Sequence, residues 1–138
     1  VKLEIDTKPP EGGVPKTVLV NKFFPITFLT FDLPSLFTGK IHALLTRPYT
    51  KGRDYFDLSW YLSRHKDLEP NFTLFKNALT QTDYKGEFPE SRNWREVLLR
   101  TLAKTDWEAV RNDVKNFLEN PKDLDALNKE NLLALLSR

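Results

Sequence analysis

The sequence predicts an α+β fold in which a small N-terminal β-sheet precedes a bundle of helices. Before residue 32, apolar and polar residues alternate, or β-branched and aromatic residues cluster, as is typical of strands. From residue 32 onward, apolar residues recur at helical spacing behind residues that cap helices. The chain has 138 residues and is 40% hydrophobic, which suffices for one core. We expect a sheet portion over 1–31 and one compact helical unit over 32–138.

Three segments of the first portion are typical of short strands. Residues 1–6 place Val1, Leu3 and Ile5 on one face and charged residues on the other, which predicts a half-buried strand. Residues 17–20 and 25–31 are rich in Val, Thr, Phe and Ile and predict two further strands.

The second portion carries helix signals along its length. Asp32 is placed to cap the first helix, and Pro34 suits its first turn. Ser91 is a candidate cap further on, and Thr105 with Glu108 matches a capping box, which predicts a break near residue 104. The pattern predicts helices over 33–46, 54–64, 72–81, 91–104 and 105–119, then one or two short helices over 121–137.

Composition excludes several classes of function. The absence of cysteine excludes disulfides, cysteine-ligated zinc, iron–sulfur clusters and a thiol nucleophile, and it fits a cytoplasmic protein. No apolar run reaches membrane-spanning length, so no membrane partner is expected. The formal net charge of +2 is too small for a protein that coats nucleic acid.

The positive charge gathers in one stretch. Residues 40–66 hold six basic and two acidic side chains, interleaved with aromatic residues. Such a stretch suits a partner that carries phosphate groups. A solvated helix face, which is the commoner origin of charge runs, is the alternative.

Lys40 is the first candidate site residue. It falls within the arc that the apolar residues of its helix cover, so its side chain must extend to solvent, pair with a carboxylate or bind an anion such as a phosphate. Gly39 precedes it in the helix interior, where glycine costs about 1 kcal/mol relative to alanine. Close approach of another chain segment or of a ligand would account for this glycine.

Asp54 and Asp57 form the second candidate. They lie three residues apart, which places both on one helical face. Their helix is apolar almost all round, which predicts burial, and buried carboxylates need partners. Lys40, Arg47 or Arg53 could supply them. Capping by Asp54 and a place in the first turn for Asp57 are the simpler explanation.

Glu4 and Asp6 form a third, weaker pair. They lie two apart on the first predicted strand, so both face the same side, and paired carboxylates can bind Mg²⁺. One strand alone supplies too few ligands for a two-metal site. The two histidines, His42 and His65, have no triad context, and we assign them no catalytic role.

Several of these blocks together resemble the AbiEii/AbiGii nucleotidyltransferase toxins of bacterial abortive-infection and toxin–antitoxin systems. A Gly-Lys-hydrophobic-His-Ala-Leu block and an Arg-Asp-x-x-Asp-Leu block, at their mutual spacing, are the most specific features. The similar segments are 2–7, 32–45, 51–58 and 113–118, so the resemblance spans nearly all of the chain.

The resemblance implies a polymerase-β-like fold and transfer of a nucleotide from an NTP with Mg²⁺, in some members to tRNA. Lys40 resembles the family lysine expected to contact the triphosphate. Asp54 matches the aspartate of a later motif, with Asp57 as its companion. Glu4, with Asp6 as the weaker candidate, resembles a strand carboxylate beside the metal. The resemblance and the basic stretch together give as nucleotide-binding candidates Lys40, Arg47, Lys51 and Arg53.

One family motif is missing from this sequence. The Gly-Ser pair and Asp-x-Asp that supply the main metal ligands lie upstream of the 1–6 segment in the family. We therefore expect the chain to be the C-terminal part of a nucleotidyltransferase, or a degenerate descendant, without transferase activity by itself; the absence of methionine agrees. The alternatives are a non-catalytic helical module that binds an antitoxin or a partner chain, and a nucleic-acid-binding domain that uses residues 40–66.

Overall fold

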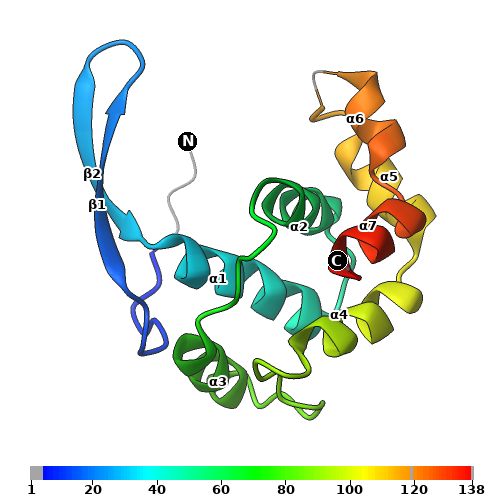
Figure 1. Ribbon diagram of the computed structural model, residues 1–138, viewed down its shortest axis with the longest axis horizontal. Coiled ribbons are helices and arrows are strands. Elements are labelled where there is room, and N and C mark those ends of the chain that lie inside the picture. Colours follow the sequence, from blue (N-terminus) through cyan, green and yellow to red (C-terminus); the bar gives the residue numbers. More distant parts are fainter. Residues whose placement is uncertain (1–4, 119, 138) are drawn as a thin grey trace.

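Two antiparallel strands followed by seven helices make up the residues that this computed structural model describes, which are 5–118 and 120–137 (Figure 1). The expected α+β class is confirmed. The elements are β1 (Pro15–Asn21), β2 (Pro25–Phe31), α1 (Leu33–Thr46), α2 (Gly52–Arg64), α3 (Phe72–Gln81), α4 (Trp94–Ala103), α5 (Trp107–Val114), α6 (Pro121–Ala126) and α7 (Lys129–Leu136).

The two strands form a hairpin that extends away from the helices (Figure 1). Their register pairs Pro15 with Phe31 and Asn21 with Pro25. The predicted strand 25–31 is confirmed, and 17–20 lies inside β1. In the predicted strand 1–6, residues 1–4 lie outside the described residues, and residues 5 and 6 belong to no strand. Both faces of the hairpin expose apolar side chains, among them Leu19, Val20, Phe28 and Leu29.

Helix α1 lies at the centre of the helical portion, with α2 on one side and α3 on the other (Figure 1). As expected, Asp32 caps it by accepting a hydrogen bond from the backbone N–H of Ser35 at 3.0 Å, and proline occupies its first turn. Phe37 and Ile41 are fully buried, and the Phe37 ring meets the Trp94 ring edge-on at 5.8 Å. The described helices thus share one core.

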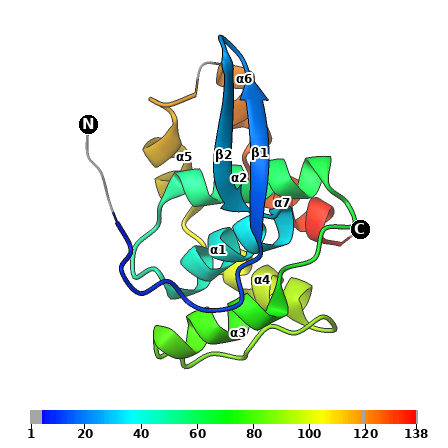
Figure 2. The same ribbon diagram turned by 90° about the vertical axis from the view of Figure 1, so that its left-hand side faces the viewer.

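An extended segment over residues 5–14 crosses α3 before the hairpin begins (Figure 2). Three amide side chains of the α3 region donate hydrogen bonds to its backbone carbonyls: Asn71 to Gly12 at 2.7 Å, Asn77 to Glu11 at 2.8 Å and Gln81 to Lys8 at 2.8 Å. We call these three side chains the amide clamp. The clamp fixes the path of the segment that carries Asp6.

Two predicted caps are wrong. The α4 N-cap is Asn93, because the hydroxyl of Ser91 points to Glu69 at 3.4 Å. The α5 N-cap is Asp106, which accepts from the N–H of Ala109 at 3.0 Å. Thr105 cannot form the expected box, since its hydroxyl donates to the carbonyl of Thr101 in the last turn of α4. Both helices are therefore shorter than predicted.

Helix α2 also differs from expectation. It begins at Gly52, so Asp54 lies in the first turn and is not the cap. Its surface is amphipathic: Leu58 is fully buried, whereas Trp60 is 42% exposed. The helix packs closely on α5, because a Cβ on Gly52 would lie 2.8 Å from Val114 Cγ1 and closer still to the Val110 carbonyl oxygen.

Candidate functional site

Two ion pairs join α1 to α2. Lys40 Nζ lies 2.5 Å from Asp57 Oδ2, and Arg47 Nη1 lies 3.1 Å from Asp54 Oδ2. The earlier residue of α1 pairs with the later residue of α2, so the facing surfaces of the two helices run in opposite directions. We call these four residues the charged seam. Both predicted carboxylates therefore have cationic partners, and both partners are among the three that the sequence offered.

The spacing of the seam brings its two cations together. Lys40 and Arg47 are seven residues apart, or about 10.5 Å along α1 at 1.5 Å per residue. Asp54 and Asp57 are three apart, which puts their Cβ atoms about 5–6 Å from each other. The long basic side chains converge on this narrower pair. Lys40 thus lies on the same seam as Asp54. Its direct partner is Asp57, which lies one turn from Asp54 on α2.

The two pairs differ in burial. Lys40 and Asp57 keep 37% and 36% of their side-chain surface exposed, so solvent and ions reach them. Asp54 keeps 8% and Arg47 28%. Arg47 Nη1 is buried and has no partner with hydrogen-bond geometry, although the carboxylate oxygen of Asp54 is within ion-pair distance. Arg47 Nη1 therefore contacts Asp54 electrostatically without an aligned hydrogen bond, which leaves part of its desolvation cost uncompensated.

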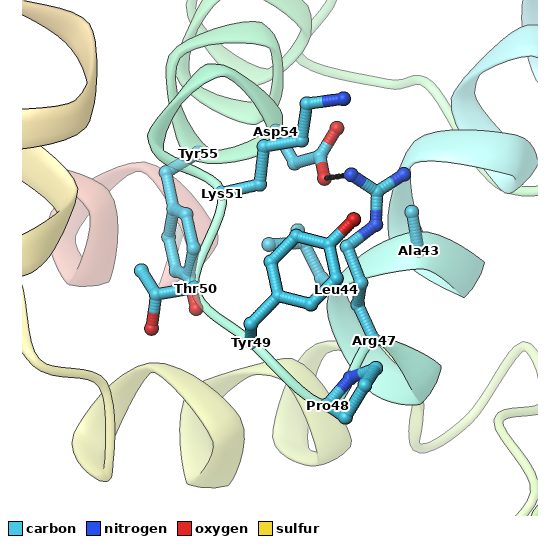
Figure 3. Close-up of a pocket in the computed structure, with 9 residues that line it drawn as sticks. All are labelled: Ala43, Leu44, Arg47, Pro48, Tyr49, Thr50, Lys51, Asp54 and Tyr55. Carbon is cyan, nitrogen blue, oxygen red and sulfur yellow. Dashed lines mark ion pairs between the residues drawn. The ribbon is translucent and has the colours of Figure 1, made fainter.

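A small cavity of about 120 Å³ opens beside the Arg47–Asp54 pair, where the loop between α1 and α2 closes (Figure 3). Lys51 and Tyr49 line it together with that pair. The guanidinium carbon of Arg47 lies 5.7 Å from the centroid of the Tyr49 ring, a cation–π contact. The cavity has room for water molecules or for a small polar group such as a phosphate.

Tyr61 stands next to the exposed end of the seam. Burial raises the pKa of its hydroxyl; Lys40 lowers it and Asp57 raises it, each to a smaller extent. The phenol therefore stays protonated at neutral pH and can donate a hydrogen bond. Sequence reasoning did not select Tyr61; its position one helical turn beyond Asp57 was the available signal.

Other predicted site residues lie apart from the seam. The guanidinium of Arg53 stacks over the Phe117 ring at 4.9 Å, on the side of α2 that faces α5. Asp6 is exposed and accepts a hydrogen bond from the N–H of Lys8 at 2.9 Å. Glu4 lies outside the described residues. The seam thus joins Lys40, Arg47, Asp54 and Asp57, with Lys51 at its edge.

A second cavity, of about 290 Å³, lies between α1 and α3. Asp6, Gly39 and His42 are part of its lining. The sequence offered two explanations for Gly39, and the first is wrong: a Cβ there would meet no atom within 4 Å, so no described segment approaches closely. His42, to which the sequence gave no role, lies in this wall because α3 packs beside it.

Comparison with protein families matches residues 1–129 to the family described as "Nucleotidyl transferase AbiEii toxin, Type IV TA system". The match covers most of the chain, and the chain belongs to this family of nucleotidyltransferase toxins. Membership confirms the resemblance seen in the sequence, and the toxin–antitoxin description implies a cognate antitoxin as partner. Comparisons with curated proteins and with solved structures returned no match.

The residues that the structure describes hold neither a cluster of metal ligands nor a membrane-spanning helix. Within residues 5–118 and 120–137, no three His, Asp or Glu side chains gather in a way that could hold a metal ion. Of the predicted pair Glu4 and Asp6, only Asp6 is among the described residues. These residues therefore do not by themselves complete a Mg²⁺ site. None of the helices in the same residues has the length and apolar character needed to cross a bilayer.

Proposed function

We propose that the charged seam binds the triphosphate of an NTP for nucleotide transfer by this toxin. Lys40 and Arg47 contact phosphate oxygens, and Lys51 adds a third positive charge at the edge. Asp57 and Asp54 are positioning residues that hold the two cations. The observation that carries the proposal is the convergence of two basic side chains of α1 onto carboxylates one turn apart on α2.

The chemistry of phosphoryl transfer supports this assignment. The reaction needs charge neutralisation and in-line positioning more than covalent help, so fixed cations are the main requirement. Lys40 is exposed enough to exchange a carboxylate for a phosphate, and Arg47 has a buried donor without an aligned partner. Arg53 does not join this site, because Phe117 holds it against α5.

Binding of radiolabelled NTP to the chain tests the proposal. Lys40→Ala should weaken binding at least tenfold, whereas Lys122→Ala, at an exposed position on α6, should leave it unchanged. An equal loss of NTP affinity in both variants would show that binding depends only on nonspecific electrostatic attraction. Unchanged binding by Lys40→Ala would refute the assignment of the seam.

The remaining parts of the reaction rest on family membership. We propose Mg²⁺ as the accompanying ion and tRNA as the acceptor, and the family resemblance gives Glu4 and Asp6 as the carboxylates for that ion. The proposal that tRNA is the acceptor can be tested by incubating the complete gene product with radiolabelled NTP and bulk tRNA. We expect labelling that Lys40→Ala abolishes and Lys122→Ala retains. A toxin that consumes NTP without labelling tRNA would exclude that acceptor.

The hairpin favours a second candidate function, that of a protein-interaction module. Phe23 is 87% exposed at its tip, Leu29 is 78% exposed on β2, and a lone hairpin is marginal in water. A covering protein surface, either the antitoxin or a second chain, would bury both. Sedimentation with and without the antitoxin tests this: Phe23→Ser with Leu29→Ser should abolish association. A wild-type chain that stays monomeric in both conditions would exclude this function.

A further inference from the structure

Gly39 has no packing reason to be glycine. Glycine is among the least favourable residues inside a helix, and Gly39 lies in the middle of α1. A Cβ built there would meet no atom within 4 Å, so the fold tolerates a larger residue. The residue is exposed, and the space that a side chain would occupy belongs to the cavity between α1 and α3.

The lining of that cavity combines apolar surface with polar groups. Leu74 and Ala78 of α3 and Pro10 of the extended segment supply apolar surface. The polar groups come from His42, Thr82 and the carboxylate of Asp6. Its volume of about 290 Å³ lies just below the range for small-molecule sites, about 300–1,000 Å³. A nucleobase fits such a space, whereas a complete nucleoside triphosphate exceeds it.

Hydrogen bonds with α3 orient the His42 ring. The Thr82 hydroxyl can donate to the Ala78 carbonyl at 2.9 Å, and its oxygen lies 3.1 Å from His42 Nε2. In that arrangement the imidazole proton sits on Nε2, and Nδ1 is an acceptor. Burial lowers the pKa of His42, which keeps the ring neutral. A neutral imidazole can accept a hydrogen bond from a ring N–H or an amino group.

The cavity and the charged seam lie on opposite flanks of α1, with the exposed face of the helix between them. At about 100° per residue, Gly39 is one step around the helix from Lys40, and His42 is about 60° further in the same direction. Gly39 thus separates the lysine from the histidine and places no side chain between them. A ligand that reached both places would pass over the exposed face of α1 at Gly39.

We infer that the α1–α3 cavity receives the base of the nucleotide whose phosphates the charged seam binds. Gly39 is the gap in the α1 surface that lets one nucleotide reach both places. This inference rests on the proposed function for the seam and adds to it a site for the heteroaromatic ring.

Filling the gap tests the inference. Gly39→Leu should place its side chain in the cavity and weaken binding of ATP, GTP, CTP or UTP, whichever the chain binds best, at least tenfold. The thermal midpoint should not fall, because nothing obstructs the new Cβ and leucine favours a helix. Ala103→Leu, at an exposed position on α4, is the matched control and should change neither quantity. Unchanged NTP affinity in Gly39→Leu, together with weak binding in Lys40→Ala, would overturn the base site and leave the seam intact.

Nucleosides test the cavity independently of phosphate binding. Adenosine, guanosine, cytidine and uridine at millimolar concentration should, for at least one of the four, shift the imidazole NMR signals of His42. His65, the other histidine, lies at the end of α2 against Trp60 and serves as internal control. A shift at His42 alone supports the base site even if NTP binding at the seam fails. No shift from any nucleoside, or equal shifts at both histidines, would overturn it.

Discussion

The Arg47–Asp54 pair can be measured by a double-mutant cycle. We consider Arg47→Met and Asp54→Asn, which remove one charge each with little change in volume. At 3.1 Å and an effective dielectric constant of about 20, the Coulomb attraction is about 5 kcal/mol before any desolvation cost. Desolvation of the nearly buried Asp54 carboxylate cancels much of it, and Arg47 Nη1 lacks hydrogen-bond alignment. We therefore expect a net coupling of about 1–2 kcal/mol.

The two single variants should differ. Arg47→Met leaves the Asp54 carboxylate buried without a cation, and we expect it to lower the free energy of unfolding by about 2–3 kcal/mol. Asp54→Asn leaves a guanidinium that is 28% exposed and can turn toward solvent, so we expect a loss of about 1 kcal/mol.

Urea unfolding followed by circular dichroism at 222 nm gives all four free energies of the cycle. Lys40→Met with Asp57→Asn, the more exposed pair of the same seam, is the comparison and should show a coupling below about 1 kcal/mol. A coupling for Arg47 and Asp54 under about 0.3 kcal/mol would refute the reasoning, because independent sites add within that margin.

Three further predictions follow from contacts described above. Gly52→Ala should lower the thermal midpoint, because overpacking against the Val110 carbonyl of α5 costs about 1–3 kcal/mol. Gly39→Ala should raise the midpoint, since alanine favours a helix. Equal shifts of the two variants in calorimetry would contradict the close contact at Gly52. Burial lowers the pKa of His42 below the 6.5 of the unfolded chain. The contribution of His42 to the free energy of unfolding should therefore be fully present above pH 6.5 and be lost as the pH falls below it. His42→Gln should make the urea midpoint less dependent on pH below 6.5. A pH dependence equal to that of the wild type would contradict the role of His42. Asn77→Ala with Gln81→Ala should speed amide hydrogen exchange over residues 8–12, while exchange in the α1 core stays slow; protection as in the wild type would show that the amide clamp is dispensable.

Element bounds could be predicted from the sequence where a single local signal acts alone. Asp32 and Pro34 define the start of α1, and Asn71 caps α3, so both helices begin and end where the pattern predicts. The starts of α4 and α5 could not be predicted, because two capping residues compete at each. Other hydrogen bonds of the two candidates decide between them. The hydroxyl of Thr105 bonds to the Thr101 carbonyl in α4 and meets the Tyr55 hydroxyl, which leaves Asp106 as the cap.

The candidate site divides in the same way. The sequence could place Lys40 and the two aspartates on helical faces that need partners, since helical periodicity alone fixes faces. It could not tell which cation pairs with which carboxylate, because that depends on how α1 crosses α2. The cavity at Gly39 depends on a third helix and on the amide clamp of the extended segment, and periodicity carries no information about either.

The exposed apolar residues of the hairpin allow the solubility of the chain to be changed without changing its thermal stability. Leu19 and Leu29 contribute no contacts to the helical core, so replacing them with threonine removes nothing that resists unfolding of the helices. Threonine also keeps a high preference for strands. Such replacements should raise the concentration at which the chain precipitates while its melting temperature stays where it was.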